Sequence, residues 1–89
     1  MRKNFKINGF VQGVGFRYRA VHAANAVCAT GWVRNNPDGS VSMEIQGTEE
    51  QMNEIFRMIA QGSWVSIDSV EAKEIPEVED ERSFGIIYD

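Results

Sequence analysis

Residues 9–17 read Gly-Phe-Val-Gln-Gly-Val-Gly-Phe-Arg, and within this stretch a strand pattern changes into a helix pattern. Upstream of it, Phe5 and Ile7 alternate with polar residues, and this period of two is typical of a half-buried strand. Glycines two residues apart break such a strand and relax the backbone. The apolar residues that follow recur near helical spacing, which predicts a helix from about residue 16 to 29 with Gly31 near its C-cap.

The rest of the chain shows further strands and one further helix. Apolar residues predict strands near residues 31–35, 41–45, 67–76 and 84–88. Between the first two of these, Asn36-Pro37-Asp38-Gly39 has the composition of a tight hairpin turn. Thr48 and Gln51 are spaced as a capping box, and apolar residues follow at i, i+3, i+4 and i+7. This pattern predicts an amphipathic helix that runs to about Gln61.

The predicted elements follow the order β-α-β-β-α-β with a short extra strand at the end. This split βαβ order belongs to the α+β class and implies an antiparallel sheet with two helices on one face. We expect one domain over residues 1–89, with Cys28 and Trp64 packed against its core. The acidic residues 77–81 are expected to form a solvated loop.

Charge is distributed unevenly along the chain, which carries nine basic and thirteen acidic residues for a net charge of −4. All the acids lie in residues 36–89, whereas residues 1–35 hold six bases and no acid. An anion that approaches the first third therefore meets only attractive side chains from that segment. The acidic remainder discourages binding to polyanions. The distribution favours a small anionic ligand and argues against nucleic acid as a partner.

Cysteine and histidine content limits the chemistry further. The single cysteine, Cys28, and the single histidine, His22, exclude an internal disulfide and a structural zinc site. No apolar run has the length of a membrane span, and the basic residues 1–6 lack the apolar segment of a secretory signal. We expect a cytoplasmic monomer that needs no metal or other cofactor and has no membrane partner.

The junction between the first strand and the first helix is the strongest candidate for a binding site. A glycine-containing loop exposes successive backbone N–H groups, and the first four N–H groups of a helix lack partners within it. Together they can cradle an anion. Arg17 falls in the first turn of the helix, and its planar guanidinium can hold a phosphate through two oxygens. Alternatively, Gly13 and Gly15 only turn the chain, and Arg17 is an ordinary surface residue.

Residues 9–17 resemble the signature G-x-V-Q-G-V-x-F-R of the acylphosphatases. Residues 31–35 (Gly-Trp-Val-Arg-Asn), 38–41 (Asp-Gly-Ser-Val) and 46–47 (Gln-Gly) resemble that family's second signature. The spacing Phe-x-Ile-x-Tyr in residues 84–88 resembles its C-terminal strand. These matches follow the family's order across nearly the whole chain. The resemblance implies the ferredoxin-like α/β sandwich of that family, which agrees with the order of elements derived above.

The resemblance also implies an activity, namely hydrolysis of small acyl phosphates to a carboxylate and inorganic phosphate without a metal ion. It implies that Asn35 positions the attacking water. It implies that phosphate binds to the side chain of Arg17 and to the backbone amides of a loop formed by Gln12, Gly13, Val14, Gly15, Phe16 and Arg17. An acyl phosphate has a good leaving group, so holding the phosphoryl oxygens and aiming a water in line is sufficient catalysis.

Three stretches depart from the family's pattern. Phe10 stands where many members carry arginine, residues 26–30 replace a common Leu-Gly-Leu, and residues 61–64 replace the usual Gly-Pro step. None of them includes Arg17 or Asn35. We expect them to affect stability and substrate fit more than the reaction itself.

Other functional readings are weaker. His22 lies about 7.5 Å from Arg17 along the helix axis, too far to share a water with a phosphate at the helix start. An RNA-recognition module has the same order of elements, but residues 39–45 lack its basic-aromatic pattern. A catalytically idle acylphosphatase-like module that binds phosphate or a partner is the main alternative. The presence of both Arg17 and Asn35 favours the enzyme.

Overall fold

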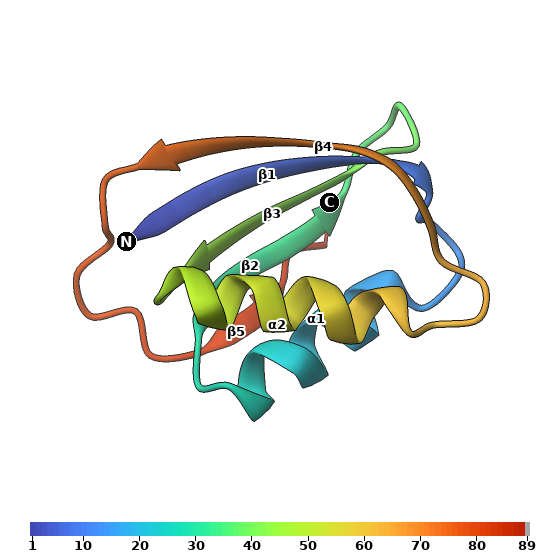
Figure 1. Ribbon diagram of the computed structural model, residues 1–89. Coiled ribbons are helices and arrows are strands. Elements are labelled where there is room, and N and C mark those ends of the chain that lie inside the picture. The colour runs from blue at the N-terminus through green and yellow to red at the C-terminus, as the bar shows by residue number, and fades with distance from the viewer. Residues whose placement is uncertain (89) are drawn as a thin grey trace.

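A five-stranded sheet carries both helices on one of its faces (Figure 1). The computed structural model describes residues 1–88, and Asp89, the last residue of the predicted domain, lies outside the described residues. The helices are α1 (Phe16–Ala26) and α2 (Glu49–Ala60). The strands are β1 (Arg2–Phe10), β2 (Thr30–Asn35), β3 (Val41–Gln46), β4 (Ser66–Ile75) and β5 (Phe84–Ile86). This arrangement confirms the predicted α+β, ferredoxin-like fold.

The strands lie in the order β4-β1-β3-β2-β5. β1 pairs antiparallel with β3 and β4, and β2 pairs antiparallel with β3. β5 instead runs parallel to β2, with Gly31 opposite Phe84 and Val33 opposite Ile86. The prediction of a wholly antiparallel sheet is therefore wrong at this edge. The loop after β4 carries the chain from one edge of the sheet to the opposite edge before it enters β5. The last strand also ends earlier than predicted, so Tyr88 lies beyond it.

The core lies between the sheet and the two helices. Alternate residues of the central strands face the helices, since successive side chains of a strand point to opposite faces. α1 contributes mainly alanines, which let it lie close to the sheet, whereas α2 contributes larger side chains. The buried apolar residues on β1, β3, α1 and α2 are Phe5, Ile7, Val41, Met43, Ile45, Phe16, Ala20, Ala23, Ala24, Met52, Ile55 and Ile59.

The capping box predicted for α2 is present. The Thr48 hydroxyl accepts a hydrogen bond from the N–H of Gln51 at 3.1 Å, and the Gln51 side chain accepts one from the N–H of Thr48 at 2.6 Å. The side-chain Nε2 of Gln51 also donates a hydrogen bond to the backbone carbonyl of Val27 at 2.7 Å. One residue thus caps α2 and ties its start to the chain just after α1.

α1 ends at Ala26, earlier than predicted. The N–H of Cys28 donates to the carbonyl of Asn25, and the N–H of Ala29 donates to the carbonyl of Ala24, which is the bonding pattern of a Schellman cap. The left-handed residue of this cap is Cys28, with φ 61°. Its side chain is exposed as a result, so the prediction of a core cysteine is wrong.

Gly31 is not part of that cap and lies inside β2. Its φ is 143°, and a side chain there would collide with the backbone of Glu44 on β3. The glycine therefore allows two strands to approach closely rather than ending a helix.

Two further expectations fail at the surface. Trp64 is 75% exposed rather than packed, because it sits in the turn that joins α2 to β4. Glu81 does not belong to a freely solvated loop, because its carboxylate binds Arg2. Within residues 1–88, no helix is long and apolar enough to cross a membrane.

Candidate active site

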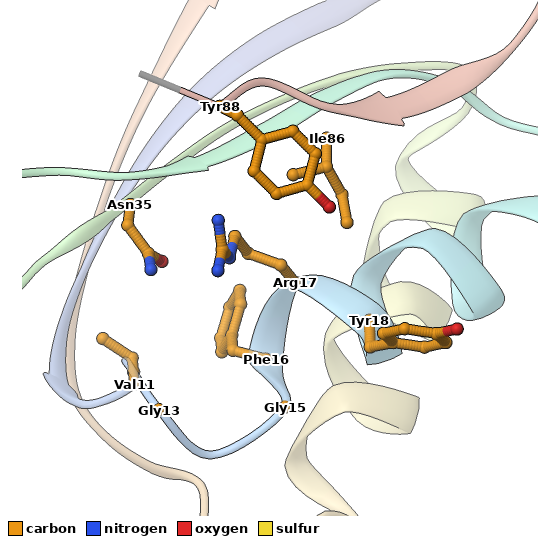
Figure 2. A pocket seen from close by; sticks show the side chains of 9 residues that line it. All are labelled: Val11, Gly13, Gly15, Phe16, Arg17, Tyr18, Asn35, Ile86 and Tyr88. Atoms are coloured by element: carbon orange, nitrogen blue, oxygen red, sulfur yellow. The ribbon is translucent and has the colours of Figure 1, made fainter.

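A cavity of about 140 Å³ opens where β1 passes into α1 (Figure 2). Three segments far apart in the sequence meet there: the loop into α1, the end of β2, and the chain at and after β5. The lining residues are Val11, Gly13, Gly15, Phe16, Arg17, Tyr18, Asn35, Ile86 and Tyr88. The volume is below the ~300 Å³ at which pockets for larger organic ligands begin, so it suits a group as small as a phosphoryl.

The loop before α1 presents unpaired backbone donors. Gly13 and Gly15 have φ of 74° and 81°, a left-handed conformation that glycine adopts without cost. Gly15 is the N-cap of α1, and no side chain caps the helix there. In the part of the chain that the structure describes, no N–H of residues 12–18 donates to a protein acceptor. The first to do so is that of Arg19, to the carbonyl of Gly15 at 3.0 Å. The loop and helix start therefore have free N–H groups, which is what the predicted anion cradle requires.

Arg17 is the second residue of α1, and its guanidinium extends toward Asn35 (Figure 2). Among residues 1–88, no carboxylate forms an ion pair with it. The ring of Tyr88 instead lies against the guanidinium, with its centroid 5.4 Å from Cζ. A cation–π contact of this kind orients the arginine and leaves its N–H donors available.

Asn35 is the last residue of β2 and lies two positions after the fully buried Val33. Because side chains alternate across a strand, Asn35 shares the helix-bearing face with Val33 and is directed at the loop before α1. Its Oδ1 atom is buried and has no hydrogen-bond partner among residues 1–88. Such an unsatisfied acceptor costs about 1–3 kcal/mol, and most buried polar atoms have a partner. A donor that enters the cavity would remove this penalty.

The side chain of Gln12 serves the loop rather than the cavity. Its Nε2 donates to the carbonyls of Asn36 and Ser40 at 2.7 and 2.8 Å. These bonds attach the glycine loop to the hairpin that begins directly after Asn35. Neither Gln12 nor Val14 lines the cavity, whereas Gly13, Gly15, Phe16 and Arg17 do.

The hairpin turn is itself well fixed. The Asp38 carboxylate accepts hydrogen bonds from the hydroxyl and the N–H of Ser40 and pairs with Lys6 at 3.2 Å. These contacts lower the pKa of Asp38 to about 2, with the Ser40 hydrogen bonds as the largest cause. Asp38 is therefore a turn residue, as its sequence context predicts.

Of the remaining candidates, neither His22 nor Phe10 lines the cavity. The His22 ring stacks on that of Tyr18 at the surface, and Phe10 is 62% exposed. Sequence reasoning missed Tyr88 at the site, and it also missed Val11, Tyr18 and Ile86. The place of Tyr88 in the C-terminal match was a signal, but only the fold shows that β5 brings it to Arg17.

Comparisons with known proteins agree with this geometry. A sequence model of the family described as Acylphosphatase matches residues 3–86. The chain belongs to the acylphosphatase family. An acylphosphatase of Clostridium acetobutylicum is 42% identical over 84 residues, which cover 93% of this chain and 92% of that protein.

Solved structures of known proteins are also similar to this chain. The crystal structure of an acylphosphatase from Bacillus subtilis superposes with a TM-score of 0.86 at 28% identity and covers 98% of both chains. Full-length HypF, solved in a phosphate- and nucleotide-bound form, matches with a TM-score of 0.84 at 30% identity. That match covers 98% of this chain and 12% of HypF, so an acylphosphatase-like unit also occurs inside a much longer protein.

Proposed function

We propose that this acylphosphatase hydrolyses small acyl phosphates to a carboxylate and inorganic phosphate, with Arg17 and the loop amides holding the phosphoryl group. Asn35 positions the attacking water. One observation carries the proposal: the same cavity is lined by an arginine without an acidic partner in residues 1–88 and by a buried asparagine oxygen without a donor. An anion satisfies the first group, and a water satisfies the second.

The reaction follows from these two positions. The phosphoryl oxygens accept hydrogen bonds from the Arg17 guanidinium and from the N–H groups of the loop, which stabilise charge on those oxygens. A water donates one hydrogen bond to Asn35 Oδ1 and attacks phosphorus in line. The bond between phosphorus and the acyl oxygen breaks, and its electron pair leaves with the carboxylate. The water's proton passes to the phosphate product, so no side chain has to act as a strong acid or base.

The cavity supplies no ligand set for a metal ion. None of its lining residues among 1–88 carries a carboxylate, a thiol or an imidazole. Nor does that part of the chain hold a cluster of three or more His, Cys, Asp or Glu side chains. We therefore propose that positive charge in the reaction comes from Arg17 and the backbone dipoles alone.

The proposal extends to one domain over residues 1–89 that acts as a cytoplasmic monomer. The single cysteine permits no internal disulfide, which suits a reducing compartment.

Hydrolysis of benzoyl phosphate, measured with and without EDTA, tests the proposal. We expect turnover that EDTA leaves unchanged. Loss of turnover on chelation with recovery in magnesium would contradict the metal-free reaction. Binding of inorganic phosphate without any turnover would identify an idle phosphate-binding module instead.

A further inference from the structure

A second depression adjoins the phosphoryl cavity on the side of α1. It has a volume of about 390 Å³ and is lined by Tyr18, Val21, His22, Ile86 and Tyr88. Tyr18, Ile86 and Tyr88 also line the phosphoryl cavity, so the two spaces are adjacent and share a wall. We call this second space the aromatic groove.

The groove is apolar and aromatic. Tyr18 and Tyr88 are 69% and 74% exposed, although large aromatic side chains are usually buried or half-buried. The Tyr18 ring stacks on that of His22, with centroids 5.4 Å apart and an angle of 28° between the planes. Among residues 1–88, none of the lining side chains is a carboxylate, a lysine or an arginine. A flat apolar group fits this surface better than a charged one.

The groove lies on the side of the phosphoryl cavity that is away from Asn35, since Asn35 lines the cavity but not the groove. In Figure 2, Arg17 stands between Asn35 on one side and Tyr18 on the other, with Tyr88 and Ile86 closing the space beside the guanidinium. A water held at Asn35 attacks phosphorus from the Asn35 side. In an in-line displacement the bond that breaks points away from the attacking water, so the acyl group leaves on the side opposite Asn35.

We infer that the aromatic groove binds the acyl group of the substrate, so that the enzyme favours acyl phosphates whose acyl group is aromatic or bulky and apolar. This inference rests on the proposed function, since it assumes that the phosphoryl group sits at Arg17. The substrate then has its anionic end in the small cavity and its apolar end between Tyr18 and Tyr88.

The test compares two substrates that are alike at the phosphoryl end, benzoyl phosphate and acetyl phosphate, in the wild type and in Tyr18→Ala. We expect the ratio of kcat/KM for benzoyl over acetyl phosphate to fall about tenfold in the variant, because the aromatic contact is lost. Tyr18→Phe keeps the ring and should keep the ratio. Trp64→Ala is the matched control, because Trp64 is equally exposed but lies outside the groove. An unchanged ratio in Tyr18→Ala would overturn the inference.

A binding measurement separates failure of the groove from failure of the proposed function. Benzylphosphonate and methylphosphonate are not hydrolysed and differ only in the aromatic group. By calorimetric competition with inorganic phosphate, the wild type should bind benzylphosphonate more tightly, and Tyr18→Ala should lose most of the difference. Equal affinities in the wild type would overturn the acyl subsite even if both acyl phosphates are hydrolysed. Absence of hydrolysis would reject the proposed function, while this competition still tests the groove.

Discussion

Arg2 and Arg17 differ in their burial and in the partners of their guanidinium groups. Arg2 is 2% exposed and donates to both oxygens of Glu81 at 2.7 and 3.2 Å, to Glu44 at 2.9 Å and to Gln46 at 3.2 Å. Arg17 is half-buried and pairs with no carboxylate of residues 1–88, and its guanidinium contacts the ring of Tyr88.

The difference separates an arginine that stabilises the fold from one that is available to a ligand. At Arg2, the protein supplies the opposite charges and the acceptors, so the guanidinium holds β1, β3 and the loop before β5 together. At Arg17, residues 1–88 supply neither, and the cavity next to it contains unpaired N–H groups. Removal of Arg2 should therefore damage stability and spare activity, and removal of Arg17 should do the reverse.

The largest expected effect belongs to Arg17→Ala. Each charge-assisted hydrogen bond contributes about 1.5–3 kcal/mol, so losing two should lower kcat/KM by about 10²–10⁴. Arg17→Lys keeps the positive charge but loses the planar guanidinium, so it should lower kcat/KM nearly as much as Arg17→Ala. The free energy of unfolding should change little, since the substitution leaves behind no acidic partner among residues 1–88. Kinetics with benzoyl phosphate and urea unfolding measure the two properties.

Arg19→Ala is the matched control for that prediction. Arg19 lies on the same helix two positions on and does not line the phosphoryl cavity. Its guanidinium packs beside Gly62, after α2. We expect kcat/KM to stay within about threefold of the wild type, as for other surface substitutions. Comparable losses at Arg17 and Arg19 would mean that diffuse positive charge, rather than a specific grip, attracts the substrate.

Asn35→Ala should have the next largest effect, on kcat alone. Removing one preorganised polar group from an active site lowers kcat by about 10²–10³. Inorganic phosphate should bind with unchanged affinity, because the proposed site holds it with Arg17 and the loop rather than with Oδ1. Competition by phosphate, measured beside turnover, distinguishes the two properties. If phosphate affinity fell together with kcat, Asn35 would be a phosphate ligand and not the residue that positions water.

Arg2→Met should lower the stability of the fold rather than the activity. Breaking a buried ion pair leaves uncompensated carboxylates, here those of Glu44 and Glu81, and typically costs about 3 kcal/mol of stability. The kcat of the folded fraction should match the wild type. Denaturant unfolding together with an assay below the transition checks both statements. A large loss of kcat at full folding would show that Arg2 and the active site are coupled, and the contrast between the two arginines would not hold.

Much of the fold and part of the site can be predicted from the sequence. Several sequence patterns depend only on neighbours within a few residues. The alternation of apolar and polar residues and the capping box at Thr48 predict the order of strands and helices. The glycines at 13 and 15 predict a loop with free N–H groups before the first helix. The motif match identified Arg17 and Asn35 as a pair, and the fold brings both to one cavity.

What could not be predicted depends on contacts between distant segments. The parallel pairing of β5 with β2 brings Tyr88 against Arg17, and no local pattern contains that pairing. The burial of Arg2 depends on Glu81, far along the chain. The left-handed cap at Cys28 is missed for a different reason, since glycine is the usual residue there and Gly31 was available nearby.

The smallest expected effect is the pH dependence of the Arg2 cluster, and it tests the stabilising half of the contrast. Burial alone would raise the pKa of the Glu81 carboxyl, but hydrogen bonds from Arg2 and Thr30 and the charge of Arg2 outweigh it and hold the pKa below its usual range. A carboxyl with a lowered folded-state pKa binds fewer protons in the folded chain than in the unfolded chain. Its contribution to stability is therefore complete above the ordinary glutamate pKa, about 4.3, and is lost as the pH falls through the folded-state value.

Glu81→Gln keeps the size of the side chain and removes this titration. The wild type should be more stable than the variant at pH 7, by less than Arg2→Met costs, and the gap should shrink as the pH falls below about 4.3. Taking the difference between the two proteins cancels the titration of the other carboxyls with a lowered pKa, which are Asp38, with a pKa of about 2, and Glu54. Urea unfolding of both proteins at several pH values between 7 and 3 gives this difference directly. A gap that stays constant over that range would mean that Glu81 stabilises the loop by shape rather than by its charge on Arg2.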